Sequence, residues 1–246
     1  MKRLLDLVVS ACLLFMASPV LLLFMLLVWM QDWQSPFYLA PRVAHGGGTF
    51  KMVKLRSMAM DADRSGVSST ATGDARVTSV GRLFRRFKLD ELTQLWNVLV
   101  GEMSLVGPRP NTRTWGVDLY TPQEMLLLSV RPGITDFSSI VFSDEGDILA
   151  GQSDPDLAYN QLIRPWKSRL SLFYIEHRSL SLDLQLIFLT ALAILSRQRA
   201  LERVSRLLAN LGAPADLVVV AQRNEELVPT PPPGAKEIVK SRVAPP

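Results

Sequence analysis

The chain has 246 residues, of which 48% are apolar and 20% charged, a composition that excludes an intrinsically disordered protein and allows one sizeable domain with accessory segments. A net charge of +4 and a pI near 9.4 accompany a positive mean hydropathy of +0.18, so the sequence predicts both membrane association and an anionic partner. Cys12 is the only cysteine, which excludes an internal disulfide, and His45 and His177 are too few for a His or Cys zinc cluster.

The first predicted element is the uncharged apolar run Leu7–Met30, which follows Lys2 and Arg3. Its length matches the ~20 residues that cross a bilayer and exceeds the ~7 to 15 residue apolar core of a signal peptide. Basic residues outnumber acids after the run as well, which favours the cytoplasmic side for both flanks. Ser18-Pro19 predicts a break, because proline removes a backbone hydrogen bond and clashes with the preceding turn. Two courses remain open, a re-entrant helix-break-helix and a kinked span.

A linker, a turn and a strand follow this run. Residues 35–42 contain two prolines and two aromatics, which is typical of an interfacial linker. The glycine-rich His45–Gly48 lacks the Lys-Ser or Lys-Thr ending of a phosphate-binding loop, so a hairpin turn is the preferred interpretation. Thr49–Leu55 alternates as a strand does, and Lys54 and Arg56 share one face of the chain.

A surface loop and a basic helix come next. Residues 57–78 are rich in Ser, Thr, Asp, Ala and Gly without an apolar period, which predicts a mobile loop with solvated acids. Gly81–Lys88 has apolar residues on one helical face and basic residues around it, which fits a helix on an anionic membrane surface. This segment leads directly into Asp90, so Arg85 is a candidate for holding phosphate near that acid. The alternative for Arg85, as for the two basic residues of the strand, is a membrane-surface contact.

The stretch Lys88–Pro110 organises the chain, since it places two adjacent acids before a basic Pro-Arg-Pro turn. Its apolar residues recur at helical spacing, and Gly101 fits the position after a helix end. Asp90 and Glu91 therefore start a short helix, and both serve one site only over its N-terminus, an end that favours anions. Arg109 is a candidate phosphate clamp, because a guanidinium binds phosphate through two hydrogen bonds. The alternatives are ordinary acids of a first helical turn and a surface arginine.

The segments after this stretch are mainly predicted helices. Thr121 and Glu124 form a capping box for a short helix. Residues 135–149 predict a hairpin with an acidic tip, which fits a polar turn better than a calcium loop. Residues 154–176 predict a helix that Pro165 must kink or divide.

Three further segments complete the chain. Leu180–Leu195 is apolar but short and interrupted by polar residues, so it predicts a core or interfacial helix instead of a second span. Arg197–Leu211 has the pattern of an amphipathic helix with basic residues. The residues after Asn224 are rich in proline and predict a disordered tail.

The motif LDEL-x-QLWNVL-x-GEMSLVGPRP within Lys88–Pro110 closely resembles the signature of the bacterial sugar transferase family, the monotopic phosphoglycosyl transferases. The resemblance covers roughly residues 1 to 200, through flanking motifs that stand in family order. These motifs are Lys2-Arg3 with Asp6, Ser18-Pro19, Phe50, Lys54-Leu55-Arg56-Ser57-Met58, Asp74-x-Arg76-x-Thr78-x-x-Gly81, Arg131-Pro132-Gly133-Ile134-Thr135 and Ser181-x-Asp183.

The chain departs from the family pattern at a few positions, none of which removes a reacting group. Thr93 stands where proline is common, Leu55 where phenylalanine is usual, and Ala40-Pro41-Arg42 replaces a Gln-x-Arg pattern. Asp136 stands where glycine often follows Pro-Gly-Ile-Thr, and it is a candidate for altering the nucleotide or sugar pocket.

The fold that this resemblance implies is an α/β, mainly α, monotopic membrane protein. Residues 1–34 would form the re-entrant membrane helix, broken at Ser18-Pro19. Residues 35–200 would form a small cytosolic catalytic domain on the inner leaflet, and residues 201–246 an amphipathic helix with a Pro-rich tail. The implied location is the cytosolic face of the bacterial inner membrane, in contact with anionic lipid.

The implied reaction moves a phosphosugar from a UDP-sugar to polyprenyl (undecaprenyl) phosphate and releases UMP, with Mg²⁺ as cofactor. By the resemblance, Asp90 is the nucleophile that carries the phosphosugar covalently, with a contact to magnesium, and Glu91 positions or deprotonates the lipid phosphate. A carboxylate supports such chemistry, since it forms an acyl phosphate and splits one difficult transfer into two. The expected phosphate- and substrate-binding residues are Arg109, Lys54, Arg56, Arg85, Pro110 and Thr135.

Other partners and one competing function are also considered. Downstream glycosyltransferases or a second copy of the chain are expected partners, and no nucleic acid is expected, because that role rests on pI alone. The competing hypothesis is a non-catalytic scaffold that binds lipid or glycan-assembly enzymes through its basic surface. Intact Asp90 and Glu91 argue against it.

Overall fold

A computed structural model describes residues 1–62, 69–86, 88–114 and 116–241, with only the backbone of Arg86. Part of the predicted surface loop, residues 63–68, and Phe87 of the predicted basic helix lie outside the described residues. The elements, in chain order, are α1 (Lys2–Asp32), β1 (Phe37–Val43), η1 (His45–Gly47), β2 (Thr49–Leu55), α2 (Ser79–Arg86), η3 (Leu89–Glu91), α3 (Gln94–Val100), β3 (Ser104–Val106), η4 (Val117–Leu119), η5 (Glu124–Ser129), β4 (Gly133–Thr135), α4 (Phe137–Val141), α5 (Glu145–Ile148), α6 (Pro155–Ala158), η6 (Tyr159–Ile163), α7 (Arg164–His177), α8 (Leu180–Leu195), α9 (Arg197–Asn210) and α10 (Ala215–Gln222).

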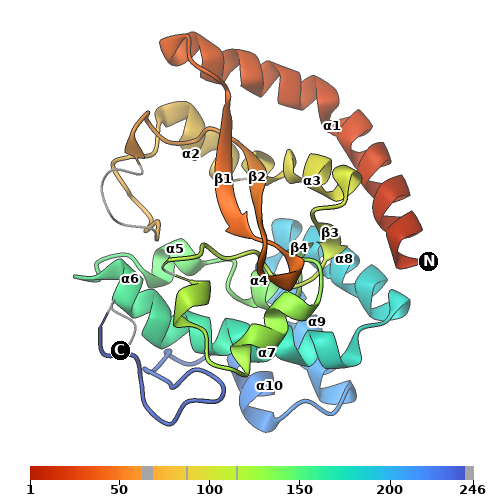
Figure 1. Ribbon diagram of the computed structural model, residues 1–246, viewed down its shortest axis with the longest axis vertical. Helices are drawn as coiled ribbons and strands as arrows, with labels where there is room; N and C mark the ends of the chain where they lie inside the picture. Colours follow the sequence, from red (N-terminus) through yellow and green to blue (C-terminus); the bar gives the residue numbers. More distant parts are fainter. Residues whose placement is uncertain (63–68, 87, 115, 242–246) are drawn as a thin grey trace.

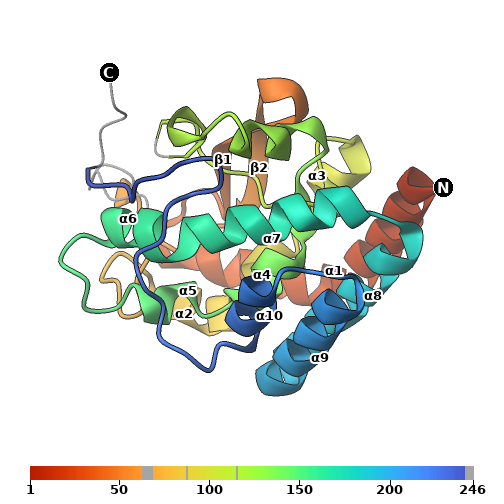
Figure 2. The same ribbon diagram turned by 90° about the horizontal axis from the view of Figure 1, so that it is seen from below.

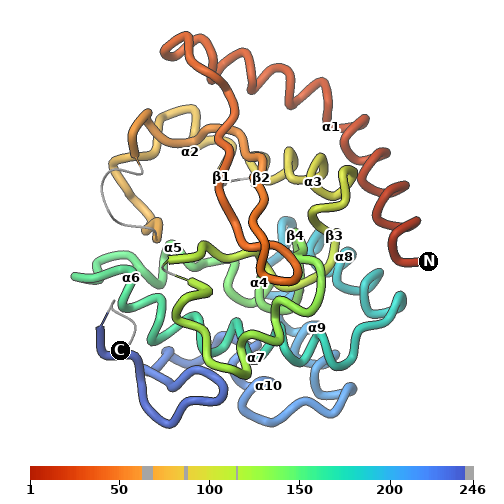
Figure 3. Tube along the Cα trace, viewed as in Figure 1, coloured from red at the N-terminus to blue at the C-terminus, as the bar shows by residue number. Residues whose placement is uncertain are grey.

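The apolar N-terminal run forms one long helix, α1, that lies against one side of the domain (Figure 1). It is long and apolar enough to cross a membrane, and only 11% of its most apolar window is buried. Pro19 lies inside the helix, and the Ser18 hydroxyl donates to the Phe15 carbonyl over 2.7 Å. The trace changes direction midway along α1 (Figure 3). The predicted break is therefore a bend within a continuous helix.

A two-stranded hairpin leads from α1 into the domain. The prediction of a strand at Thr49–Leu55 is confirmed as β2, which pairs antiparallel with β1 from Phe37↔Leu55 to Val43↔Thr49. The predicted linker at residues 35–42 is wrong, because most of it forms β1. The turn at η1 is confirmed as a hairpin connection, and Gly46 and Gly47 adopt positive φ values of 74° and 86° there.

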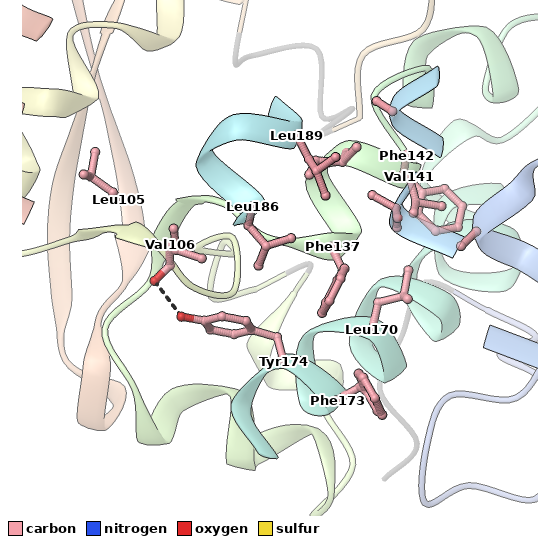
Figure 4. Packing of buried hydrophobic residues seen from close by; sticks show 14 of the residues in the cluster. Leu105, Val106, Phe137, Val141, Phe142, Leu170, Phe173, Tyr174, Leu186 and Leu189 are labelled. Atoms are coloured by element: carbon pink, nitrogen blue, oxygen red, sulfur yellow. Dashed lines mark hydrogen bonds between the residues drawn. The ribbon is translucent and has the colours of Figure 1, made fainter. Parts of the chain in front are cut away.

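The core lies between the sheets and the C-terminal helices. β3 and β4 form a second, parallel pair, and both lie over α8. Buried apolar side chains from β3, α4, α7 and α8 pack together, as Figure 4 shows. The Tyr174 hydroxyl in this core donates to the Val106 carbonyl over 3.3 Å. The described residues are mainly helical with two small sheets, which agrees with the expected mainly α composition.

In the helices that follow β4, one prediction is wrong and others are confirmed. The predicted hairpin over residues 135–149 is wrong, because the segment forms α4 and α5. The physical cause is the Asp136 carboxylate, which accepts from the Ser139 amide over 2.8 Å and so caps α4. The helix predicted over residues 154–176 is divided into α6, η6 and α7, with Pro165 in the first turn of α7. The segments Leu180–Leu195 and Arg197–Leu211 are helical as predicted, in α8 and α9.

The C-terminal tail follows a defined path through residue 241, where a disordered tail was predicted. In Figure 2 it passes across α6 and α7. The Thr230 amide donates to the Gln161 carbonyl over 3.0 Å, and Arg169 donates to the Pro231 carbonyl over 2.9 Å. The described part of the tail lacks regular secondary structure, and its backbone is bonded instead to residues of η6 and α7.

Candidate active site

Asp90 and Glu91 lie in η3, a single 3-10 turn that continues almost directly into α3. Lys88 precedes this turn with a left-handed φ of 56°, which reverses the chain after α2. The Glu91 amide then donates to the Lys88 carbonyl over 3.2 Å. The predicted helix start is thus a tighter 3-10 turn, and the expected C-terminal Gly101 is confirmed with a φ of 94°.

Side chains of α3 fix this turn against the open edge of β2. The Thr93 hydroxyl donates to the Val53 carbonyl over 3.0 Å. The Asn97 amide group donates to the Lys51 carbonyl over 2.9 Å and accepts from the Val53 amide over 2.9 Å. These bonds satisfy strand groups that would otherwise be unpaired. They also bring the acids of η3 close to Lys54, the residue after Val53.

Glu91 and Arg109 form a two-point ion pair. Arg109 donates through Nη2 to Oε1 of Glu91 and through Nη1 to Oε2 over 3.2 Å, and the side chains are 28% and 19% exposed. Burial opposes ionisation of Glu91, but Arg109, followed by Lys54 and Lys88, lowers the pKa of its carboxyl to about 2. Glu91 is therefore an anion at neutral pH, and it holds Arg109 in place.

Asp90 is buried more deeply than Glu91, with 8% exposure. Burial raises the pKa of its carboxyl, and Glu91 raises it further, while Lys54 and two other basic residues lower it. The helix N-terminus was expected to favour ionisation, and here burial and the like charge outweigh it. Among the residues that the structure describes, the Asp90 carboxylate has no hydrogen-bonding side chain and no ion pair. A ligand cation or phosphate group can therefore approach it without displacing a partner.

Lys54 is the third member of this cluster. Burial, with a further contribution from Arg109, lowers the pKa of its ammonium group to about 8, although Glu91 and Asp90 act in the opposite direction. Lys54 thus changes charge near neutral pH. A lysine of this kind binds an anionic phosphate most strongly when it is protonated.

The structure brings together only some of the predicted residues. Lys54, Asp90, Glu91 and Arg109 influence one another electrostatically and form one cluster. Arg85 acts on Asp90 and lowers the pKa of its carboxyl. Pro110 is buried beside Arg109 and keeps the turn rigid.

Two predicted binding residues have other partners. Arg56 donates to Asp32, with Nη2 to Oδ1 at 2.6 Å, and to the Ser35 carbonyl over 2.9 Å, so it binds the end of α1. Thr135 is buried, and its hydroxyl shares a 2.6 Å hydrogen bond with Thr190 of α8. These two residues position elements around the site.

Asp136, a candidate for shaping the substrate pocket, lies in the core instead. It is fully buried, and its carboxylate accepts from the hydroxyls of Ser138, Ser139 and Ser171 at 2.6 to 2.8 Å. All of these contacts are internal. Asp136 therefore acts as a helix cap and a connection between α4 and α7.

One ion pair close to the cluster was not predicted. Lys167 of α7 donates to the Glu145 carboxylate of α5, and Arg109 and Lys88 also help to lower the pKa of Glu145. The sequence signals were the acidic tip at residues 144–147 and an isolated lysine. The pairing joins α5 to α7, and no sequence pattern connects these two segments.

A divalent cation at this site would have few ligands from the protein. Among residues 1–62, 69–86, 88–114 and 116–241, no group of three or more His, Cys, Asp or Glu is arranged to hold a metal. Mg²⁺ commonly binds through one or two carboxylates together with substrate phosphates and water. The unpaired Asp90 carboxylate fits that mode, so a magnesium ion would be shared with a phosphorylated ligand.

Comparisons with known proteins identify the family of the chain. The family described as bacterial sugar transferase matches residues 1–197. The chain therefore belongs to the bacterial sugar transferase family.

Individual relatives carry more specific names. The UDP-glucose:undecaprenyl-phosphate glucose-1-phosphate transferase of Caulobacter vibrioides is 33% identical over 202 residues, 81% of this chain and 71% of the relative. The UDP-N-acetylgalactosamine-undecaprenyl-phosphate N-acetylgalactosaminephosphotransferase of Aeromonas hydrophila is 32% identical over 197 residues, 79% of this chain and 44% of the relative. The undecaprenyl-phosphate glucose phosphotransferase of Komagataeibacter xylinus is 37% identical over 195 residues, 77% of this chain and 35% of the relative.

The chain thus spans less than half the length of two of these relatives. The names of the three relatives mention two different sugars, glucose and N-acetylgalactosamine. The matched region includes the whole acid and base cluster described above. The family match ends at the start of α9, so α9, α10 and the tail lie beyond it.

Proposed function

We propose that this protein transfers a phosphosugar from a UDP-sugar to polyprenyl phosphate, giving polyprenyl-diphosphate-sugar and UMP. The observation that carries the proposal is the buried Asp90 carboxylate, which has no side-chain partner among the described residues, next to the Glu91–Arg109 ion pair and Lys54. Relatives named for sugar-phosphate transfer to undecaprenyl phosphate support the substrate classes. Such a reaction would be the first membrane step of a polysaccharide or glycoconjugate pathway.

In the first step, an Asp90 carboxylate oxygen attacks the phosphorus that bears the sugar. A new bond forms between this oxygen and phosphorus, the bond from that phosphorus to the bridging oxygen breaks, and UMP departs with the electron pair. Arg109 and Lys54 balance the charge of the phosphate oxygens, which an anionic nucleophile requires. The product on the enzyme is an acyl phosphate that carries the sugar.

In the second step, an oxygen of polyprenyl phosphate attacks the same phosphorus. The bond from phosphorus to Asp90 breaks, and the carboxylate is regenerated. Glu91 keeps Arg109 in position for both steps and assists in placing or deprotonating the lipid phosphate. Arg85 and Lys88, which lower the pKa of Asp90, add positive charge on the approach to the site.

Magnesium is the proposed cofactor, held by Asp90 together with the substrate phosphates. When bound, it supplies positive charge that favours ionised Asp90 and lowers the negative charge of the diphosphate. The raised pKa of Asp90 gives the protein a physical need for such a counter-charge.

A re-entrant course for α1 is the proposed membrane topology, with the domain on the cytosolic face of the inner membrane and its surface against anionic lipid. Contacts at both ends of the helix support this course. Lys2 donates to Asp183 over 2.6 Å, and Asp32 at the other end pairs with Arg56. A single domain that contacts both ends lies on one side of a bilayer.

Release of UMP from a panel of UDP-sugars, with polyprenyl phosphate and Mg²⁺, tests the proposed reaction. We expect release with at least one donor from the wild type and none above background from Asp90→Ala. Equal release by both proteins would contradict the nucleophile assignment. Absence of release with every donor would favour a non-catalytic membrane scaffold.

A further inference from the structure

The C-terminal tail, which the structure describes through residue 241, lies beyond the family match and has no assigned role. It contains three consecutive prolines at residues 231–233 and crosses α6 and α7 in Figure 2. Consecutive prolines favour the extended polyproline II conformation, because each ring fixes its own φ. The carbonyl groups of such a segment form no internal hydrogen bonds, so they are available to donors on a neighbouring surface.

Side chains of the domain bind the carbonyl groups of the tail. The Thr121 hydroxyl donates to the Pro233 carbonyl over 2.5 Å, and Arg169 of α7 donates to the Pro231 carbonyl over 2.9 Å. The Arg169 guanidinium also lies over the Trp166 ring, 4.8 Å from its centre, which limits the directions in which it can donate. Aromatic rings beside side-chain donors are typical of surfaces that recognise proline-rich segments. The tail thus lies on a surface of matching chemistry.

Packing and a second hydrogen bond fix the tail around the proline run. The last two of the three prolines are buried. A Cβ added at Gly234 would lie only 3.0 Å from the Cβ of Gln123, so the backbone approaches the domain closely there. Farther along, the Gln161 side-chain amide donates to the Val239 carbonyl over 2.7 Å. The tail is therefore held both at the prolines and after them.

The residue that binds the tail is adjacent to the surroundings of Arg109. Tyr120, which precedes Thr121, lines a small cavity together with Arg109, Pro110 and Asn111. The Asn111 side-chain amide also donates to the Tyr120 hydroxyl over 3.4 Å. Contacts thus connect the tail, through Thr121 and Tyr120, to the turn that carries Arg109.

We propose that tail residues 229–234 form a strap that fixes the Arg109 turn for the binding of phosphate. The inference rests on the proposed function, in which Arg109 binds substrate phosphates. Glu91 orients the guanidinium, and the strap holds the backbone of the turn through Thr121 and Tyr120. When the strap leaves its surface, Thr121 loses a hydrogen-bond partner and Tyr120 is less restrained. The Arg109 turn can then shift, and phosphate binds more weakly.

Pro232→Gly combined with Pro233→Gly should release the strap from the domain. The change removes two buried rings and gives the free tail more conformational freedom. Pro229→Gly, at an exposed proline of the same tail, is the matched control. Limited trypsin digestion of the full chain measures the release, because Lys236 closely follows the prolines. We expect cleavage after Lys236 to be about ten times faster in the double variant only. Equal rates in the wild type and the double variant would overturn the inference.

The dissociation constant of UDP, measured by calorimetry with Mg²⁺, tests the link from the strap to Arg109. UDP carries both phosphates of the donor without the sugar. We expect the double proline variant to bind UDP about three- to thirtyfold more weakly than the wild type, a usual range for coupling through packed contacts. Pro229→Gly should bind UDP as the wild type does.

A double-mutant cycle with Arg109→Lys separates positioning of Arg109 from a general loss of stability. If the strap acts through Arg109, the proline changes should weaken UDP binding no further once Arg109→Lys is present. Additive losses, or unchanged UDP binding with a released tail, would overturn the inference. A wild type that binds no UDP and releases no UMP would instead overturn the proposed function, and the trypsin rates distinguish that failure from a tail that is not held.

Discussion

At the scale of single residues, the two adjacent acids of the candidate site have different pKa shifts because their surroundings differ. Arg109 keeps Glu91 ionised, while burial raises the pKa of Asp90, whose carboxylate forms no ion pair with any residue that the structure describes. Neighbouring acids with opposite pKa shifts are typical of sites in which each has its own task. Lys54 also differs from the arginines of the site, because lysine changes its charge near neutral pH and arginine does not.

Lys54→Arg should remove the alkaline limb of the pH profile. In the wild type, Lys54 is protonated below about pH 8, so activity should fall as the pH rises through that value. Arginine stays protonated up to a pH of about 12, so the variant should keep its relative activity at pH 9. UMP release between pH 6 and 10 measures this. Lys51→Arg, on the exposed part of the same strand, is the control, and an alkaline limb unchanged in Lys54→Arg would contradict the role.

Arg164→Met should destabilise the domain strongly. Arg164 and Glu124 form a buried ion pair with 2% and 0% side-chain exposure, and Glu124 also accepts from Ser168 and from the Thr121 amide. Removal of the arginine leaves a buried carboxylate without its counter-charge, which costs about 3 to 5 kcal/mol. Thermal unfolding in detergent micelles is the measurement.

A surface pair provides the comparison for this variant. Arg206 pairs with Glu202 at 3.6 Å, and the side chains are 75% and 50% exposed. Arg206→Met should therefore change stability by less than about 1 kcal/mol. Similar melting temperatures for the Arg164 and Arg206 variants would show that the buried pair adds no stability.

At the scale of elements, the geometry of the site depends on the attachment of η3 and α3 to the edge of β2. Thr93 and Asn97 supply side-chain hydrogen bonds to the strand, and this contact sets the distance between the acids and Lys54. The C-terminal half of α3 is fixed in turn by Arg3 of α1, whose Nη2 donates to the Leu99 carbonyl over 2.9 Å. The acidic turn is thus held from both a strand and the membrane helix.

Thr93→Val tests this attachment, since it replaces the hydroxyl by a methyl group of similar size. The Val53 carbonyl would lose its partner, which costs about 1 to 3 kcal/mol. We expect a lower unfolding midpoint in denaturant and a lower kcat, because the acids shift relative to Lys54. Thr93→Ser keeps the hydroxyl and should retain both properties; equal losses in the two variants would point to packing instead of the hydrogen bond.

The type of an element, helix or strand, could be predicted from the sequence where a pattern of residues extended over a long segment. Leu180–Leu195 was found as a helix with the same bounds, and the Thr121 capping box has both of its expected hydrogen bonds, at 3.0 and 3.1 Å. Short segments were less predictable, because tertiary contacts decide their form. The β-branched and aromatic run at residues 137–142 favours a strand, but the buried Asp136 caps it into a helix.

The candidate site shows a similar division. Its acids and Arg109 lie in one continuous motif, so the sequence alone identified them. Glu145 and Lys167 come from distant segments, and no spacing rule connects them. Arg56 was assigned to phosphate because it shares a strand face with Lys54, but the strand ends there and Arg56 reaches Asp32.

At the scale of the whole molecule, α1 is a candidate membrane segment that also contacts the rest of the domain at both of its ends. Its 31 residues would measure about 46 Å if straight, more than the ~30 Å hydrocarbon core of a bilayer. Near the N-terminal end, Asp6 accepts from the Ser104 hydroxyl over 2.9 Å and from the Leu105 amide over 3.1 Å. The two ends of the helix therefore contact the same domain, and in the proposed re-entrant course the bend at its middle would let the apolar part enter the lipid between them.

This arrangement predicts that both flanks of α1 lie on one side of the membrane. Cysteines in an N-terminal tag and at Gln34→Cys, in a Cys12→Ser background, should both resist a membrane-impermeant thiol reagent applied to intact cells. Both should react in inverted vesicles, where the cytosolic face is exposed. A spanning helix would instead place one of the two cysteines outside, so labelling of a single site in intact cells would contradict the re-entrant course.

The Arg56–Asp32 ion pair holds the C-terminal end of α1 against the domain. Arg56→Ala removes this pair, so the helix end should be released and Gln34→Cys should react faster with the thiol reagent in inverted vesicles.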